Sequence, residues 1–224
     1  MDILRALFAD GSISENVIGV IVYGSSITKN KSPDSDIDVR IICRAIEPSN
    51  YEKIVEGSRF HVQTTPLNAI LNAISNEIDW LIGQIKDCQI IYERGEIMTS
   101  LKKICNQFKF SKLSITEDIR LSEETYEYAQ KFVEKEDLAA CFLCIAYSSL
   151  RLGRARLKQN NLFYRGPKYL ISQFQEVSIN EMMLLRTIFG GSLNLLDIKK
   201  KMEALKEFIE IAKADFLQSG ARTL

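Results

Sequence analysis

The chain has few of the residues that mark fibrous, secreted or disordered proteins. Its 224 residues include four prolines and eleven glycines, too few for a collagen-like or low-complexity chain. It has one histidine and five cysteines, an odd number, and the cysteines lie in apolar surroundings. We therefore expect buried free thiols of a reducing compartment, rather than a disulfide framework or a metal or redox site at Cys141 and Cys144.

An excess of charge of one sign is also missing. Lys and Arg together number 29, as do Asp and Glu, so the formal net charge is zero. This balance argues against a protein that coats nucleic acid through bulk charge. The longest apolar run, Leu138 to Tyr147, has ten residues, whereas a membrane span needs about 20. The first residues also lack the basic segment and long apolar core of a secretion signal. We expect a soluble, cytoplasmic protein without a membrane partner.

The character of the sequence changes near residue 105. Before it, short β-rich runs alternate with helical stretches, and a helix is predicted after Pro66. Strands are predicted over 17–23, 36–43, 59–64 and 89–92. After residue 105 the apolar spacing is helical, which predicts long helices over 115–133, 138–159 and 202–216. The sequence therefore predicts a small α/β (α+β) domain over residues 1–104, followed by an all-helical bundle domain over 105–224.

One segment places a glycine-serine pair and two aspartates at the ends of two predicted strands. Gly24 lets the backbone turn sharply and approach a ligand closely. Ser25 and Ser26 follow at once, where backbone N–H groups and hydroxyls can converge on an anion. Asp36 and Asp38 have the strand period of two, so both carboxylates point to one face. Such a pair suits Mg²⁺, and a phosphate site beside Mg²⁺ favours phosphoryl or nucleotidyl transfer.

This pattern resembles the signature of the DNA polymerase β-like nucleotidyltransferase superfamily: Gly24-Ser25, ten residues, then Asp36-Ile37-Asp38. The likeness covers residues 17–104, and the second half is similar to the kanamycin-nucleotidyltransferase-like branch in layout. The resemblance implies a small mixed sheet with helices on one face. It also implies that Asp36 and Asp38 are catalytic and hold two Mg²⁺ ions. An acceptor hydroxyl would attack the α-phosphate of a nucleoside triphosphate (NTP), and pyrophosphate would leave.

The third carboxylate that is usual in that superfamily has no acidic counterpart on the next strand. Strand parity places its apolar residues in the core, and Arg59, His61 and Gln63 face the site. Gln63 is the first choice for the vacant position and His61 the second. An amide cannot take a proton and binds Mg²⁺ more weakly than a carboxylate. Either His61 serves as the base, or an acid reaches in from the helical half, or catalysis is weak or absent. The alternative function is therefore an inactive, antitoxin-like binding or regulatory module.

The second half carries one charge feature, the basic segment 151–168, which has six Lys and Arg and no acid. Arg151, Arg154 and Lys158 share a helix face by their spacing. Lys168 follows the Gly166-Pro167 break at a helix start, whose dipole favours anions, and we predict that it binds the nucleotide. The segment is either a positive field that meets a triphosphate or a nucleic acid backbone, or a solvated basic face. The expected partners are an NTP and an acceptor that is a small molecule, a protein or an RNA end.

Overall fold

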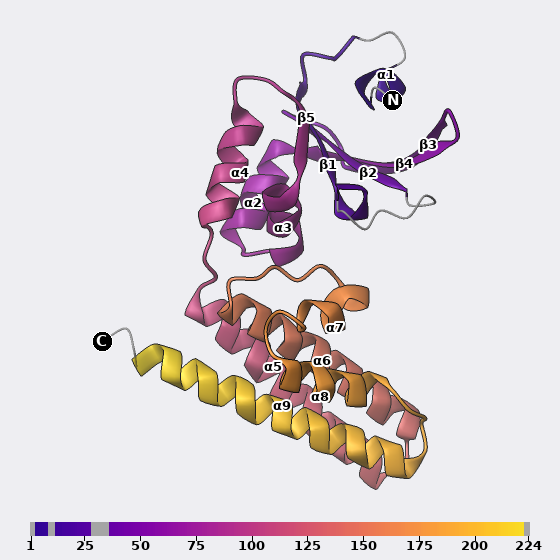
Figure 1. Cartoon of the computed structure of the whole chain (residues 1–224), viewed down its shortest axis with the longest axis vertical. Coiled ribbons are helices and arrows are strands. Elements are labelled where there is room, and N and C mark those ends of the chain that lie inside the picture. The colour runs from indigo at the N-terminus through magenta and orange to yellow at the C-terminus, as the bar shows by residue number, and fades with distance from the viewer. Residues whose placement is uncertain (1–2, 9–11, 28–35, 222–224) are drawn as a thin grey trace. The chain divides into compact units, whose positions relative to one another are not determined.

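The computed structural model describes residues 3–8, 12–27 and 36–221, and of residues 25, 26 and 219–221 it describes the backbone only. The chain divides into two compact units, residues 1–108 and 109–224 (Figure 1). The predicted boundary after residue 104 lies inside α4 (Ile97–Gln107). This helix packs on α3 (Asp79–Asp87) and on the sheet, so the first unit includes all of it.

The first unit is built on a mixed sheet with the strand order β3-β4-β2-β1-β5. The strands are β1 (Val17–Tyr23), β2 (Ile37–Cys43), β3 (Ser49–Val55), β4 (Ser58–Pro66) and β5 (Gln89–Glu93). β2 and β4 run parallel, and the other neighbours are antiparallel. The mixed sheet followed by a helical region confirms the predicted fold class. β3 is missing from the predicted strands, because it is a mostly exposed edge strand without an apolar alternation.

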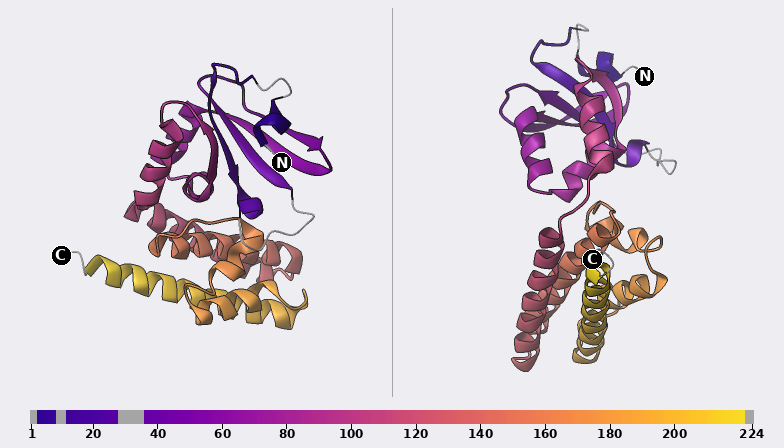
Figure 2. Two further views of the ribbon diagram at one scale, coloured as in Figure 1. Left: turned by 45° about the horizontal axis from the view of Figure 1, so that its top comes forward. Right: turned by 90° about the vertical axis from the view of Figure 1, so that its left-hand side faces the viewer.

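Helices cover the two faces of the sheet unequally. The apolar residues of β2 and β4, among them Val39 and Val62, pack against the short helix α1 (Ile3–Leu7). α2 (Leu67–Ser75), α3 and α4 pack on the other face (Figure 2). β1 lies between both layers and is buried along its whole length, which explains its β-branched composition. The resemblance implied helices on one face, and the structure adds α1 on the second.

β3 and β4 form a hairpin with a two-residue turn. Both turn residues, Glu56 and Gly57, have positive φ angles, 49° and 77°. Turns of this kind match the right-handed twist of the two strands they join. The hairpin brings β4 back beside β2 in the parallel direction, with Asp38 opposite His61 and Arg40 opposite Gln63. The hairpin therefore carries the strand that completes the polar end of the sheet.

Within its described residues, 109–221, the second unit is a bundle of four longer helices. These are α5 (Lys112–Glu134), α6 (Leu138–Gln159), α8 (Ile179–Phe189) and α9 (Leu195–Ala221). The short η2 (Pro167–Tyr169) and α7 (Leu170–Gln173) lie between α6 and α8. The side chains of Ser111, Asp137 and Ser178 accept backbone N–H groups at the starts of α5, α6 and α8, as N-caps commonly do.

α6 carries the longest apolar run of the sequence, Leu138 to Tyr147. Among the described residues it alone is long and apolar enough to cross a membrane, although 39% of that stretch is buried within the chain. It packs against α5, α8 and α9. A core helix of a soluble bundle meets the same criteria of length and composition, and these contacts account for its apolar character.

Candidate active site

The predicted glycine turn and the second aspartate meet where β1 ends and β2 begins. The antiparallel register pairs Tyr23 with Asp38, and Gly24 follows with a φ angle of 74°. A Cβ atom on Gly24 would lie 2.5 Å from Oδ2 of Asp38. The carboxylate therefore occupies the space that any other side chain would fill. Glycine is needed here both for the left-handed backbone and for this close approach.

Ser25 and Ser26 lie in η1 (Gly24–Ile27), a single 3₁₀ turn that follows β1 directly. The first N–H groups of such a turn lack partners within it and can bind an acceptor. The side chains of both serines, and all of residues 28–35, lie outside what the structure describes. The binding of phosphate by the two hydroxyls therefore stays a prediction.

Each aspartate has a basic side chain of β4 as a neighbour. Nδ1 of His61 lies 3.4 Å from Oδ1 of Asp38, with side chains 33% and 29% exposed. Nε of Arg59 lies 3.7 Å from Oδ1 of Asp36, with both side chains about half exposed. The charge of Arg59 offsets that of the Asp36 carboxylate. The carboxylates and the imidazole all remain accessible to solvent.

Gln63 lies two residues after His61 on β4, and its side chain binds Arg40 instead of an aspartate. Its Oε1 accepts a hydrogen bond of 2.5 Å from Nη2 of Arg40, the residue opposite it in the sheet. Arg40 also donates to Thr65 and to Gln84 of α3, at 2.7 Å and 2.8 Å. The structure therefore brings His61 beside Asp38 and holds the amide of Gln63 at Arg40.

Arg40 is a buried cation that the sequence reasoning missed. It is 3% exposed, and its side-chain hydrogen bonds to Gln63, Thr65 and Gln84 all go to neutral oxygens. The rings of Tyr23 and Trp80 have centroids 5.4 Å and 5.8 Å from its Cζ, a distance at which aromatic faces stabilise cations. Burial lowers the pKa of Arg40. Burial also raises the pKa of Tyr23, against the effect of the Arg40 charge. In the sequence, Arg40 shares the strand face of Asp36 and Asp38, and nothing there indicates that α3 buries it.

The carboxylate oxygens at this site are ligands of the kind that a hard cation such as Mg²⁺ binds. Asp36 and Asp38 offer oxygen ligands, and the small volume of Gly24 gives the Asp38 carboxylate its room. Among residues 3–8, 12–27 and 36–221, no three or more His, Cys, Asp and Glu side chains are grouped to hold a metal. Mg²⁺ commonly binds one or two carboxylates and completes its shell with water and phosphate oxygens. Two carboxylates are thus enough to hold Mg²⁺ where water and phosphate oxygens complete its shell.

Lys168, the predicted nucleotide ligand of the helical half, is exposed in η2. Its Nζ lies 4.8 Å from the centroid of the Tyr169 ring. The helix that follows, α7, has four residues. The helix dipole that was expected to attract an anion to Lys168 is therefore the dipole of a single turn. Binding of a nucleotide by Lys168 stays a prediction.

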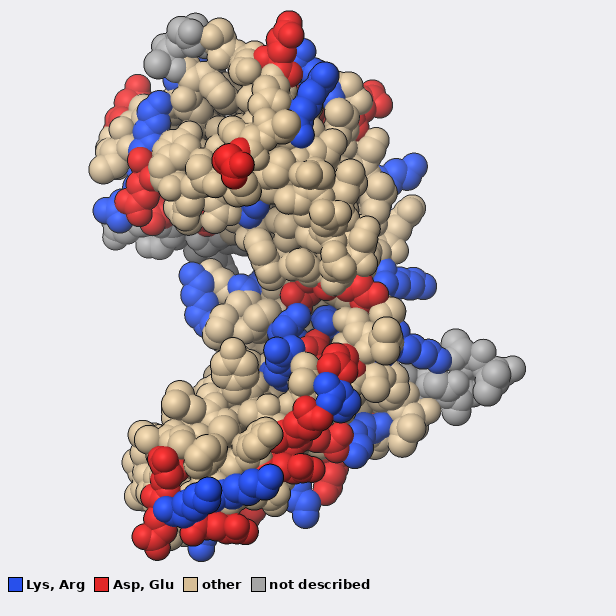
Figure 3. Space-filling model, turned by 180° about the vertical axis from the view of Figure 1, so that it is seen from behind, with Lys and Arg blue, Asp and Glu red and all other residues tan. Residues whose placement is uncertain are grey.

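The basic segment 151–168 is neither a uniform positive field nor a solvated face. Arg156 and Lys158 are buried. Arg156 pairs with Glu181 of α8 at 2.6 Å and with Asp215 of α9 at 2.7 Å. Lys158 pairs with Asp118 of α5 at 2.7 Å. On the face drawn in Figure 3, the helical unit likewise carries basic and acidic side chains next to one another. Acids from other helices thus match much of the segment's charge.

The comparisons with known proteins support the fold. No family model matches the chain, and no curated protein matches it. The crystal structure of a nucleotidyltransferase-like protein from Exiguobacterium sibiricum 255-15 is similar to it, with a TM-score of 0.59 and 12% sequence identity. The match covers 99% of this chain and 79% of that one. At this identity the likeness shows the fold alone, which is that of a nucleotidyltransferase-like protein.

Proposed function

We propose that this protein transfers a nucleoside monophosphate from an NTP to a hydroxyl acceptor, in a Mg²⁺-dependent reaction that releases pyrophosphate. The observation that carries the proposal is the close approach of Gly24 to Asp38, which puts a tight glycine turn against a carboxylate at the end of β1. The fold supports it, because a solved structure similar to the chain is a nucleotidyltransferase-like protein.

The residues of the site would divide the work as follows. Asp36 and Asp38 would hold the metal, and the backbone N–H groups at Ser25 and Ser26 would bind phosphate oxygens. Bound Mg²⁺ would polarise the phosphate and offset the charge of the leaving pyrophosphate. Asp38 contacts Nδ1 of His61, which orients the ring and leaves Nε2 to accept the proton of the attacking hydroxyl.

The partners follow from the same reasoning. The donor is an NTP, with Lys168 as a further contact to it, and the acceptor is a small molecule, a protein or an RNA end. We place the reaction in the cytoplasm, because the cysteines are all free thiols and four of the five are buried. Free thiols persist in a reducing compartment.

Thermal unfolding of the full chain with each of the four NTPs, with and without Mg²⁺, tests the proposal. A ligand at 100 times its Kd stabilises the folded state by about 2.7 kcal/mol. We expect this Mg²⁺-dependent stabilisation in the wild type and its loss in Asp38→Asn and Asp36→Asn. Glu47→Gln removes an exposed carboxylate beyond β2 and serves as the matched control. Equal stabilisation of wild type and Asp38→Asn would sink the proposal.

A second candidate is a catalytically inactive module that keeps the nucleotide site. It is favoured by the absence of a third carboxylate among the described residues near Asp36 and Asp38. Release of pyrophosphate from NTP, with water or an added alcohol as acceptor, separates the two functions. For an enzyme we expect His61→Ala to reduce release by about a hundredfold or more, while NTP binding is kept. For an inactive module, wild type and Asp38→Asn release pyrophosphate equally slowly.

A further inference from the structure

Trp80, the single tryptophan of the chain, is 47% exposed in the first turn of α3. The apolar residues of α3 that follow it, Leu81, Ile82 and Ile85, are buried. Full burial of an aromatic side chain stabilises a fold more than partial burial does, because more apolar surface leaves water. Trp80 therefore keeps a large, flat apolar surface in water, where a ligand can reach it.

Both the backbone and the ring of Trp80 are held in place. Its backbone N–H donates to Oδ1 of the buried Asp79, at 2.8 Å. Cζ of Arg40 lies 5.8 Å from the centroid of the ring. The same guanidinium donates to Gln84 of α3 at 2.8 Å. Trp80 and Gln84 are four residues apart and share a helix face, so Arg40 contacts α3 at two neighbouring positions and fixes the ring before any ligand binds.

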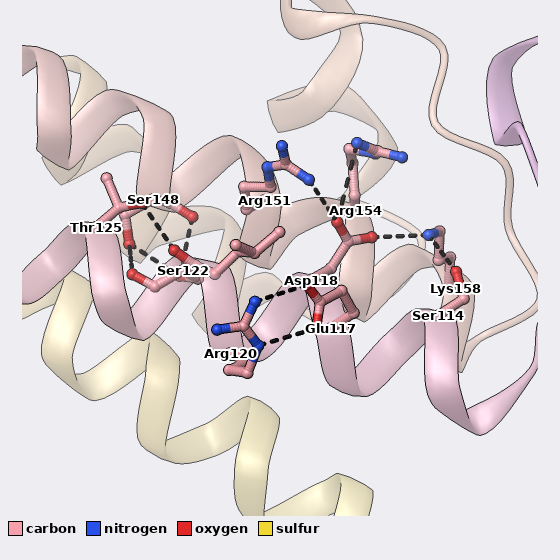
Figure 4. A network of polar contacts seen from close by, with 11 residues as sticks. Ser114, Glu117, Asp118, Arg120, Ser122, Thr125, Ser148, Arg151, Arg154 and Lys158 are labelled. Atoms are coloured by element: carbon pink, nitrogen blue, oxygen red, sulfur yellow. Dashed lines mark hydrogen bonds and ion pairs between the residues drawn. The ribbon is translucent and has the colours of Figure 1, made fainter.

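The charge of Arg40 is stabilised in a different way from that of a buried cation in the helical unit. Lys158 of α6 has a carboxylate partner, Asp118, at 2.7 Å (Figure 4). The side-chain hydrogen bonds of Arg40 go to neutral groups, so the rings of Trp80 and Tyr23 take a larger share in stabilising its charge. This attraction between cation and ring ties the indole to the sheet.

Arg40 also connects Trp80 to the candidate site within the same unit. Arg40 follows Asp38 by two residues on β2, so both side chains lie on one face of the sheet, with Cα atoms about 7 Å apart. Tyr23 lies opposite Asp38, and its ring centroid is 5.4 Å from Cζ of Arg40. Burial raises the pKa of Tyr23, the charge of Arg40 opposes this, and the charge of Asp38 adds to it. The exposed indole is thus one side chain away from the end of the sheet that carries Asp38.

Every nucleobase has a flat π face, and stacking on an aromatic side chain tolerates all of them. We propose that the exposed indole of Trp80 is a stacking site for the nucleobase of the NTP. This assignment rests on the proposed function, because the donor nucleotide supplies the base. Stacking alone does not read the edge of a base, so the site is expected to bind the four NTPs with similar affinities.

Because Trp80 is the single tryptophan, its fluorescence reports on stacking directly. The full chain is titrated with Mg²⁺-ATP and with Mg²⁺-tripolyphosphate, which has the phosphates but no base. We expect ATP to quench the emission and tripolyphosphate to bind without quenching. By isothermal titration, Trp80→Leu should weaken the binding of ATP about five- to 150-fold and leave that of tripolyphosphate unchanged. Ile104→Ala, the matched control, removes a side chain of α4 that is 49% exposed, and both affinities should stay at the wild-type level.

Trp80→Phe keeps an aromatic ring beside Arg40, so it should bind ATP more tightly than Trp80→Leu, and the quenching of the wild type needs no variant at all. Equal ATP affinity of the wild type and Trp80→Leu would overturn the proposal, as would an equal loss in Ile104→Ala. Binding of ATP and tripolyphosphate without quenching would overturn the stacking site and leave the proposed function standing. Quenching by ATP without binding of tripolyphosphate would support the stacking site and contradict the phosphate site of the proposed function. Binding of neither ligand would overturn both.

Discussion

Replacing Gly24 by alanine tests the contact between the turn and Asp38. The substitution has two separate costs. The φ angle of 74° lies in the left-handed region, which costs a residue other than glycine about 1–2 kcal/mol. The new Cβ would also lie 2.5 Å from Oδ2 of Asp38, and such overpacking costs about 1–3 kcal/mol. We expect the free energy of unfolding of the first unit to fall by about 2–5 kcal/mol.

Gly57→Ala is a control that carries only the first cost. Gly57 has a φ angle of 77°, and a Cβ there would have no atom within 4 Å. We expect a loss of about 1–2 kcal/mol. In an Asp38→Ala background the Cβ of residue 24 gains room, so the cost of Gly24→Ala should fall to that of the control. The double-mutant cycle then isolates the contact energy between the two positions.

Urea unfolding followed by tryptophan fluorescence measures these effects in the first unit, because the single tryptophan, Trp80, lies in α3. The Mg²⁺-dependent stabilisation by NTP should also be lost in Gly24→Ala and kept in Gly57→Ala. The reasoning fails if Gly24→Ala costs no more than Gly57→Ala. It also fails if the excess cost persists when the Asp38 carboxylate is absent.

Three further predictions concern stability and reactivity. Glu181→Gln removes the buried partner of Arg156 but leaves Asp215, so chemical denaturation should show a loss of about 2–3 kcal/mol, and a loss near zero would contradict the pairing. Hydrogen bonds from Thr99 lower the pKa of Glu93 from 4.5. The wild type should therefore have a higher Tm than Glu93→Gln at pH values over 4.5. This difference in Tm should vanish as the pH falls through the lowered pKa. Burial raises the pKa of the thiols of Cys88, Cys105 and Cys141 to about 11. Mass spectrometry should therefore find these thiols alkylated by iodoacetamide only after unfolding.

The strands around the candidate site could be predicted from the sequence, but not the neighbours of their polar residues. The β-branched run of β1 and the alternation of polar and apolar residues in β2 were sufficient to predict these two strands. The period of two puts His61 and Gln63 on one face, and only the register with β2 decides which of them meets Asp38. That register involves a hairpin whose Glu56-Gly57 turn is not one of the pairs typical of two-residue turns.

The ion-pair partners of the charged residues could not be predicted either, because they are distant in sequence. The segment 151–168 contains no acid, yet its cations meet Asp118, Glu181 and Asp215 from three other helices. A count of charges along the chain therefore overstated the positive field. Likewise, Arg40 reads as a polar residue within a strand, and its burial depends on Gln84 and Trp80 of α3.

β1 lies between β2 and β5 in the sheet and receives these two partners at very different times during synthesis. β2 begins at Ile37 and β4 ends at Pro66, so every strand of the candidate site has by then been made. β5, which pairs Glu93 with Gly19 of β1, has still to emerge from the ribosome. Until then β1 is an edge strand of seven buried, mostly apolar residues, and such an edge is a template for association between chains. A nascent chain is therefore most prone to aggregate after its site strands are complete, and this period ends when β5 and α4 cover β1.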